Sequence, residues 1–259
     1  MRKYLTLIVA VCALVALSVA GIASAANKPV KVTAGNLEMT FNGGFTPKVL
    51  PKKTFAPIGL TVEGDINTVD GKQPPALKEF VVETDKNGAI NVKGFPTCKG
   101  SALQSRDTKA AEGACGDAII GEGTTDIVVE FPEQAPIPVK SKLLLFNGGF
   151  SGGTTTLYVH AYITVPTPAA VVTTVKVKSV KNGRYGTKSV ATVPKIAGGY
   201  GSVTHFDLDI PKSPKYKGKK YDILTAKCPD GKLQAHGTAV FKDGTKVSAE
   251  VIRPCTGKG

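Results

Sequence analysis

The chain has 259 residues, of which 42% are hydrophobic, and it carries 33 Lys and Arg against 20 Asp and Glu. This apolar fraction is sufficient for a packed core and excludes disorder over most of the length. The length fits one or two domains, and an all-β sandwich of this size can form a single unit.

The first 25 residues have the three parts of a secretory signal peptide. Arg2 and Lys3 precede an apolar stretch over residues 5–20, and Ala23-Ser24-Ala25 forms a cleavage site. We expect cleavage there; the alternative is an uncleaved anchor, since the stretch could nearly span a bilayer. No later segment is as hydrophobic, so we expect no transmembrane anchor after cleavage and a secreted or envelope-associated chain. Loss of Arg2 and Lys3 leaves 31 basic residues against 20 acidic ones, a net charge of +11.

Cleavage would also remove Cys12 and leave four cysteines. An even number in an exported protein predicts two disulfides. Four cysteines allow three pairings, and short loops favour Cys98 with Cys115 and Cys228 with Cys255. Free thiols and a zinc site are the alternatives. No C-x-x-C or H-x-x-x-H pair accompanies these cysteines, so we expect no metal.

Turn-forming dipeptides recur along the chain and separate stretches in which apolar and polar residues alternate. Residues 175–178, 205–210 and 246–251 alternate most clearly, which indicates half-buried antiparallel strands. About a dozen or more such strands predict an all-β fold, an antiparallel β-sandwich. The dipeptides supply the positive φ angles of tight turns, and they are Asn42-Gly43, Asp70-Gly71, Asn87-Gly88, Gly148-Gly149, Asn182-Gly183, Gly198-Gly199, Asp230-Gly231 and Asp243-Gly244.

The pentapeptide FNGGF occurs at residues 41–45 and again at 146–150. The sequences around the two copies do not align, which argues against a duplicated domain. We interpret the repeat as turn chemistry between aromatic strand ends.

Only residues 101–114 have a helical composition, and Cys98 and Cys115 flank them. The first disulfide would therefore attach one short helix to the sheet. We predict one β-sandwich domain over residues 26–259. The prolines of Val165-Pro166-Thr167-Pro168 suggest a sub-boundary near 165–169, and an ordinary loop is the alternative that we favour.

The last part of the chain is predicted to form a three-stranded meander over residues 221–227, 232–241 and 245–253. Cys228 and Cys255 would then lie at the same end of the first and third strands. Flat neighbours would hold those ends about 9.6 Å apart, beyond the usual disulfide reach of about 7 Å. The bridge therefore requires a strand that changes sheet, or strand ends that curl together.

Several long segments are similar to known sequences; they include PPALKEFVVETDKNGAINVKGFPTC, KAAEGACGDAIIGEG and YKGKKYDILTAKCPDGKLQAHG. These segments resemble a group of exported actinobacterial proteins of unknown function, over about residues 74–237. The resemblance implies export and a source class, and it transfers no functional residue.

Motifs for nucleotide chemistry or hydrolysis are missing. Gly199-Tyr200-Gly201-Ser202 departs from G-x-S-x-G, and no phosphate-binding or dinucleotide loop occurs, so we expect no cofactor. Residues 65–71 approach a calcium loop, but Ala76 stands where a carboxylate is required. His205, Asp207 and Asp209 project from one face of a strand and could hold a metal or an acid/base pair. A solvated polar face is the reading that we favour.

Positive charge concentrates in one lysine-rich segment that also contains Tyr216 and Tyr221. It predicts a site for an anionic polymer such as wall teichoic acid, extracellular nucleic acid or lipid headgroups. The alternative, which we favour, is a solubilising loop that protects an edge strand, because lysines without arginine lack the bidentate donors of specific phosphate recognition. The lysines are Lys212, Lys215, Lys217, Lys219 and Lys220.

A second candidate lies in residues 157–163, where Tyr158, His160 and Tyr162 alternate with aliphatic residues. Period two places the three rings on one face. An open face would suit a sugar or another polar ligand. A covered face would be a second core layer, which is the alternative that we favour.

These patterns together predict a secreted, basic, non-catalytic binding or structural module at the cell envelope. The expected partner is an anionic or carbohydrate polymer, although the absence of Trp weakens the case for sugar. The alternative is a secreted hydrolase whose carboxylate and His residues lie on separate strands. A hydrolase should show a deep cleft with converging acids, and a binding module a shallow face.

Overall fold

The computed structural model describes residues 28–259, so the predicted signal peptide lies outside the described residues. Twelve antiparallel strands form one large sheet in an order that differs from the chain order. In spatial order they are β1 (Val30–Ala34), β2 (Leu37–Thr46), β5 (Gly59–Thr68), β13 (Gly201–Ile210), β8 (Ile119–Val129), β9 (Ile137–Ser151), β10 (Thr154–Ile163), β11 (Ala169–Asn182), β12 (Tyr185–Thr192), β6 (Leu77–Asp85), β17 (Lys232–Phe241) and β18 (Lys246–Pro254).

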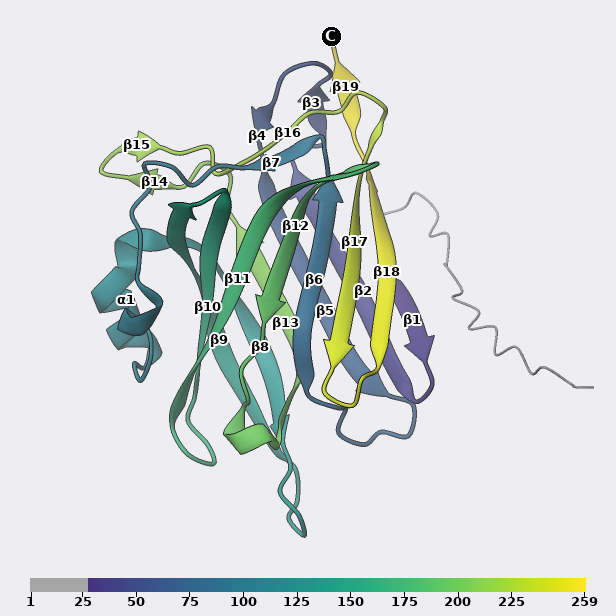
Figure 1. Ribbon diagram of the computed structural model, residues 1–259, viewed down its shortest axis with the longest axis vertical. Helices are drawn as coiled ribbons and strands as arrows, with labels where there is room; N and C mark the ends of the chain where they lie inside the picture. The colour runs from purple at the N-terminus through teal and green to yellow at the C-terminus, as the bar shows by residue number, and fades with distance from the viewer. Residues whose placement is uncertain (1–27) are drawn as a thin grey trace, which may run out of the picture.

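This sheet folds over on itself and forms a two-layered sandwich (Figure 1). One layer contains β1, β2, β5, β13 and β8, and the other contains β11, β12, β6, β17 and β18. Strands β9 and β10 form the bend between the two layers. The fold brings the two ends of the sheet, β1 and β18, side by side. The predicted antiparallel β-sandwich is confirmed.

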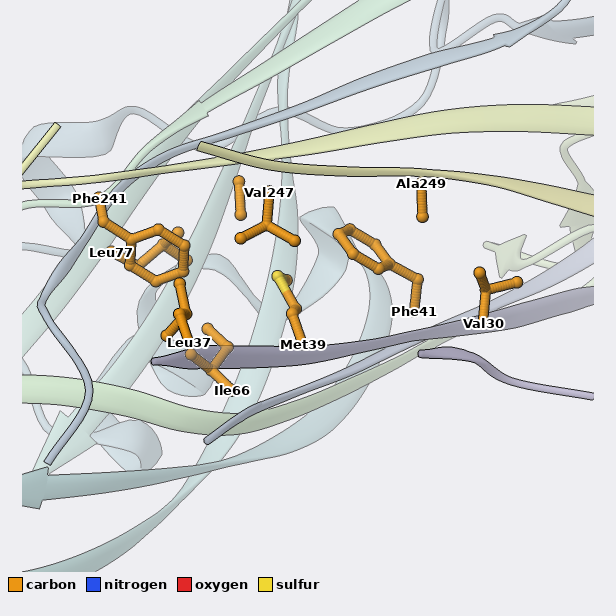
Figure 2. Packing of buried hydrophobic residues seen from close by; sticks show 10 residues of the cluster. Val30, Leu37, Met39, Phe41, Ile66, Leu77, Phe241, Val247 and Ala249 are labelled. Carbon is orange, nitrogen blue, oxygen red and sulfur yellow. The ribbon is translucent and has the colours of Figure 1, made fainter. Parts of the chain in front are cut away.

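Period-two alternation determines which side chains fill the space between the layers. In β18, Val247 and Ala249 are buried while Lys246 and Ser248 are exposed. Figure 2 shows how Val247 packs with Met39 and Ile66 from the opposite layer. Each such aliphatic side chain contributes roughly 1.5–3 kcal/mol on burial, and these contacts hold the layers together.

Short elements cover the ends and one outer face of the sandwich. A three-stranded sheet lies at one end, a hairpin projects beside it, and a parallel pair joins two distant segments (Figure 1). These strands are β4 (Ala56–Pro57), β16 (Leu224–Ala226) and β7 (Gly88–Ile90); β14 (Lys215–Tyr216) and β15 (Lys219–Lys220); and β3 (Val49–Pro51) with β19 (Thr256–Lys258).

The helical segment is shorter than predicted. Helix α1 (Thr108–Cys115) begins after Asp107, whose carboxylate accepts a hydrogen bond from the Ala110 backbone N–H at 2.7 Å. This cap sets the start of the helix, because it satisfies an amide that has no partner within the helix. The remaining helical turns are the 3₁₀ segments η1 (Gly100–Ala102), η2 (Gly116–Ala118) and η3 (Ala197–Gly199).

Both predicted disulfides are confirmed. Cys98 and Cys115 lie 5.6 Å apart between Cα atoms, and Cys228 and Cys255 lie 6.1 Å apart. The predicted meander is correct only for the β17–β18 hairpin, because β16 pairs with β4 and β7 instead of with β17. A strand that leaves the large sheet therefore brings Cys228 within reach of Cys255.

Two predicted turns lie inside strands instead. Asn42-Gly43 is in β2 and Gly148-Gly149 is in β9, whereas the other dipeptides lie at turns, bends or element ends. A Cβ atom on Gly43 would stand 2.7 Å from the Thr61 carbonyl oxygen, so glycine is required here for close approach of two backbones. The proline-rich loop at 165–168 joins β10 to β11, which pair with each other along the sheet. Within residues 28–259, no helix is both long and apolar enough to cross a membrane.

Replacing Cys228 and Cys255 by serine should lower the free energy of unfolding by about 3 kcal/mol, because the bridge spans 27 residues and restricts the unfolded chain. Urea unfolding of the oxidised protein and the double variant measures this difference. A Cys98→Ser/Cys115→Ser variant provides a control with the other bridge intact. An unchanged urea midpoint in the Cys228/Cys255 variant would contradict the expectation.

Candidate functional site

The predicted lysine cluster forms a projecting hairpin, which we call the lysine hairpin (residues 212–220). Strands β14 and β15 pair with Lys215 opposite Lys220 and Tyr216 opposite Lys219. Figure 1 shows the hairpin extending from the side of the sandwich near β7. All five predicted lysines are exposed: Lys212, Lys215, Lys217, Lys219 and Lys220.

Aromatic contacts anchor the lysine hairpin to the core. Tyr216 and Tyr221 pack edge-on against the buried Phe95, with ring centroids 6.4 and 5.1 Å away. The ammonium groups of Lys217 and Lys219 lie 5.3 and 5.0 Å from the centroids of Tyr216 and Tyr221. Among the described residues, none of the five lysines has a carboxylate partner. The hairpin therefore presents its charge to solvent from a fixed base.

The structure buries one ring of the predicted aromatic stripe of β10 and leaves the other two half-buried. His160 is completely buried, and its Nε2 lies 2.9 Å from the Arg106 carbonyl oxygen. Tyr158 and Tyr162 are half-buried. A Cβ atom on Gly100 would stand 2.8 Å from the Tyr158 ring, so the loop backbone rests directly on that ring.

Tyr158 and His160 belong to a second core layer between the sheet and α1. The layer contains buried residues of both β9 and α1, including Phe146 and Ala111. Burial lowers the pKa of His160, and the hydrogen bond to Arg106 and the charge of Asp107 only partly oppose this effect. A carbonyl oxygen can only accept, so the Nε2–H of His160 donates to Arg106. Tyr158 and His160 are therefore packed, whereas Tyr162 is half-buried.

The predicted polar face of β13 contains an ionic cluster with the neighbouring β5. His205 Nδ1 lies 2.7 Å from Asp65 Oδ1, its cross-strand partner, and His205 Nε2 lies 3.6 Å from Asp207 Oδ2. Glu63, Asp65 and His205 bring three potential ligand atoms within 4.8 Å of one another. Asp209 lies further along the strand and is exposed.

The electrostatics of this cluster favour the protonated form of His205. Burial lowers the pKa of His205, but the hydrogen bond to Asp65 and the charges of Asp65, Asp207 and Asp126 outweigh it and raise the pKa above its ordinary value. A metal ligand must be a neutral imidazole. A metal ion would therefore have to compete with the proton that these carboxylates stabilise on His205.

The sequence patterns did not predict a cavity inside the sandwich. It has a volume of about 270 Å³ and lies between the layers, next to β7 and β16. Arg253 contributes to its wall. The available signal was Arg253 itself, because period two continues the inward series Val247, Ala249 and Val251 to this charged residue.

No family model, no curated protein and no solved structure matches this chain.

Replacing Tyr158 by alanine should lower the free energy of unfolding by about 2–3 kcal/mol, because it removes a ring packed beneath the Gly100 loop. Tyr158→Phe is the matched control, since it keeps the ring and should stay within about 1 kcal/mol of the wild type. Thermal and urea unfolding measure both variants. Unchanged stability in Tyr158→Ala would show that the ring is not part of the core.

His205 should make the fold less stable as the pH rises. Its folded-state pKa is raised, so its contribution is complete below the unfolded value near 6.5 and is lost as pH increases through the folded value. The stability difference between wild type and His205→Asn should therefore shrink from pH 5.5 to pH 8.5. Urea unfolding at several pH values and NMR titration of the imidazole test this. A pKa at or below 6.5 would contradict the ion pair.

Proposed function

We propose that this protein is a secreted, non-catalytic binding module of the cell envelope, and that it holds anionic polymers through the lysine hairpin. The single observation that carries the proposal is the fixed, exposed set of five lysines without carboxylate partners among the described residues. Such a set creates a local positive potential that attracts polyanions.

The form of the site suits general polyanion binding. Lysine is a flexible point charge, whereas specific phosphate recognition favours the bidentate arginine fork. All basic residues of the hairpin are lysine. We therefore infer recognition of charge density along a polymer such as wall teichoic acid, with little dependence on its sequence or branching.

Several observations support this reading over its alternatives. The packing of Tyr158 and the burial of His160 reduce the aromatic platform that carbohydrate binding would use. For a hydrolase, the closest grouping of His and carboxylates in the described part is the His205 cluster, which lies on an outer face as mutual ion pairs. Two disulfides fit an oxidising compartment.

Replacing all five hairpin lysines by glutamine should weaken binding to a polyanion strongly. Duplex DNA serves as a probe of defined charge density, and we measure affinity at several salt concentrations. Each lost phosphate contact should reduce the steepness of log K against log salt by about 0.9, so five lost contacts should reduce it by up to about 4.5. Retention of wild-type protein on isolated cell walls should fall steeply between 0.1 and 1 M salt.

A second five-lysine variant controls for net charge. It replaces exposed lysines outside the hairpin that have no carboxylate partner among the described residues, namely Lys178, Lys181, Lys188, Lys195 and Lys246. The proposal predicts a much smaller effect of this change on affinity. Equal losses in both variants would assign the binding to overall charge, and salt-independent wall retention would overturn the proposal.

A further inference from the structure

The cavity between the layers has an apolar lining. Phe41 and Phe80, which stack with centroids 6.2 Å apart, separate it from the packed core shown in Figure 2. Its walls include Leu60, Val62 and Val82. At about 270 Å³ it exceeds the roughly 150 Å³ of an engineered apolar cavity that binds benzene. It is close to the lower limit of about 300 Å³ for small-molecule sites.

The inward-facing side chains around the cavity are less buried than the inward-facing side chains of the packed core. By period two, Leu60, Val62, Val82 and Val251 face inward, yet all four are only half-buried. Inward-facing residues in the core of Figure 2, such as Met39 and Ile66, are completely buried. The space between the layers is therefore filled at one end and open at the other.

Arg253 places a positive charge in the wall of this apolar space. The residue is only 5% exposed. Its guanidinium donates to the carbonyl oxygens of Gly43 and Ile252 and, over 2.9 Å, to the side-chain oxygen of Asn42. These bonds use three of the five N–H donors, and all three acceptors are neutral.

The other charged groups at the cavity wall do not neutralise Arg253. Asp85 pairs with Arg184 over 2.6 Å, and Glu63 is linked to Arg253 only through the Asn42 amide. Burial alone lowers the pKa of Arg253, and its charge in turn helps to lower the pKa of Lys48, after the larger effect of that lysine's own burial. A buried cation without a carboxylate partner is rare, because desolvation makes it costly.

We propose that the cavity binds a single-chain amphiphile with a carboxylate head, such as a fatty acid, with the carboxylate on Arg253 and the alkyl chain against the apolar walls. The two remaining N–H donors of Arg253 can donate to a carboxylate oxygen, and such charge-assisted bonds are strong away from water. The half-buried Leu60, Val62, Val82 and Val251 would cover the chain. This site is separate from the lysine hairpin and does not depend on the function proposed above.

Three ligands with the same alkyl chain test the site: decanoate, 1-decanol and decyltrimethylammonium. Titration calorimetry and displacement of a dansyl-labelled fatty acid measure binding to the wild-type protein. We expect one decanoate per chain, bound at least about tenfold more tightly than decanol, as a charge-assisted hydrogen bond predicts. The cationic ligand should not displace the probe.

Variants then assign the binding to the cavity. Arg253→Gln should weaken decanoate at least about tenfold and leave decanol nearly unchanged. Lys246→Gln removes the same charge from the outer face of the same strand and should change neither ligand. Ala235→Phe places a ring in the cavity and should abolish binding of both. The five-lysine hairpin variant should still bind decanoate.

The outcomes separate the possibilities. Equal affinity for decanoate and decanol in the wild type would overturn the proposal without any variant, even if Arg253→Gln fails to fold. Full binding by a folded Ala235→Phe would place the ligand elsewhere. Loss of decanoate in the hairpin variant alone would assign it to surface charge. None of these results bears on polyanion binding by the hairpin.

Discussion

The folding of one sheet over on itself is the constraint on which the other features depend. Twelve strands in a single sheet bury an apolar face only when the sheet doubles back, and doubling brings its two ends together at β1 and β18. Beyond the end of β1, β18 comes close to β2. Arg253 of β18 joins the two strands there by hydrogen bonds to Gly43 and Asn42 of β2. Closure of the sandwich therefore depends on polar contacts at one end and on side-chain packing at the other.

The glycine and asparagine residues have related roles in the two copies of the FNGGF pentapeptide. Gly43 allows the close approach of β2 to β5, and Gly148 lies where a Cβ atom would meet the Thr156 carbonyl oxygen at 2.9 Å. The side-chain oxygen of Asn42 accepts a hydrogen bond from Arg253, and the buried Asn147 donates one to the carbonyl oxygen of Pro96. In each copy the asparagine binds a segment from elsewhere in the chain to the strand that carries the pentapeptide. The two copies are therefore alike in their local hydrogen bonding.

The sequence allowed prediction of features that depend on neighbouring residues. Alternation in β18 and the short spacing of Cys98 and Cys115 are local signals, and both gave correct results. The same reasoning placed Gly43 in a turn, because the reason for this glycine is Thr61 on another strand. The burial of His160 depends likewise on Arg106, 54 residues earlier in the chain. The lining residues of the cavity come from eleven strands, and no local pattern contains the relative positions of so many strands.

The two positive sites differ in their dielectric surroundings. The lysines of the hairpin are exposed, so their attraction for anions extends about one Debye length and weakens with salt. The guanidinium of Arg253 is buried in the wall of a mostly apolar cavity, where a charge interacts more strongly and is screened less. The proposed outer site would thus suit long polymers, whereas the proposed inner site would suit a small anion.

The covalent connection next to Arg253 has a consequence for the order of assembly. Cys228 lies two residues after β16, which lines the cavity, and Cys255 lies two residues after Arg253. One disulfide therefore links the β16 wall of the cavity to the Arg253 wall. β19 then pairs with β3, about two hundred residues earlier in the chain. Because Val251 and Arg253 line the cavity, it is complete only when β18 is in place. If the N-terminal part of the chain becomes available for folding first, the apolar inner face would stay exposed to its surroundings until residues 246–258 are also available.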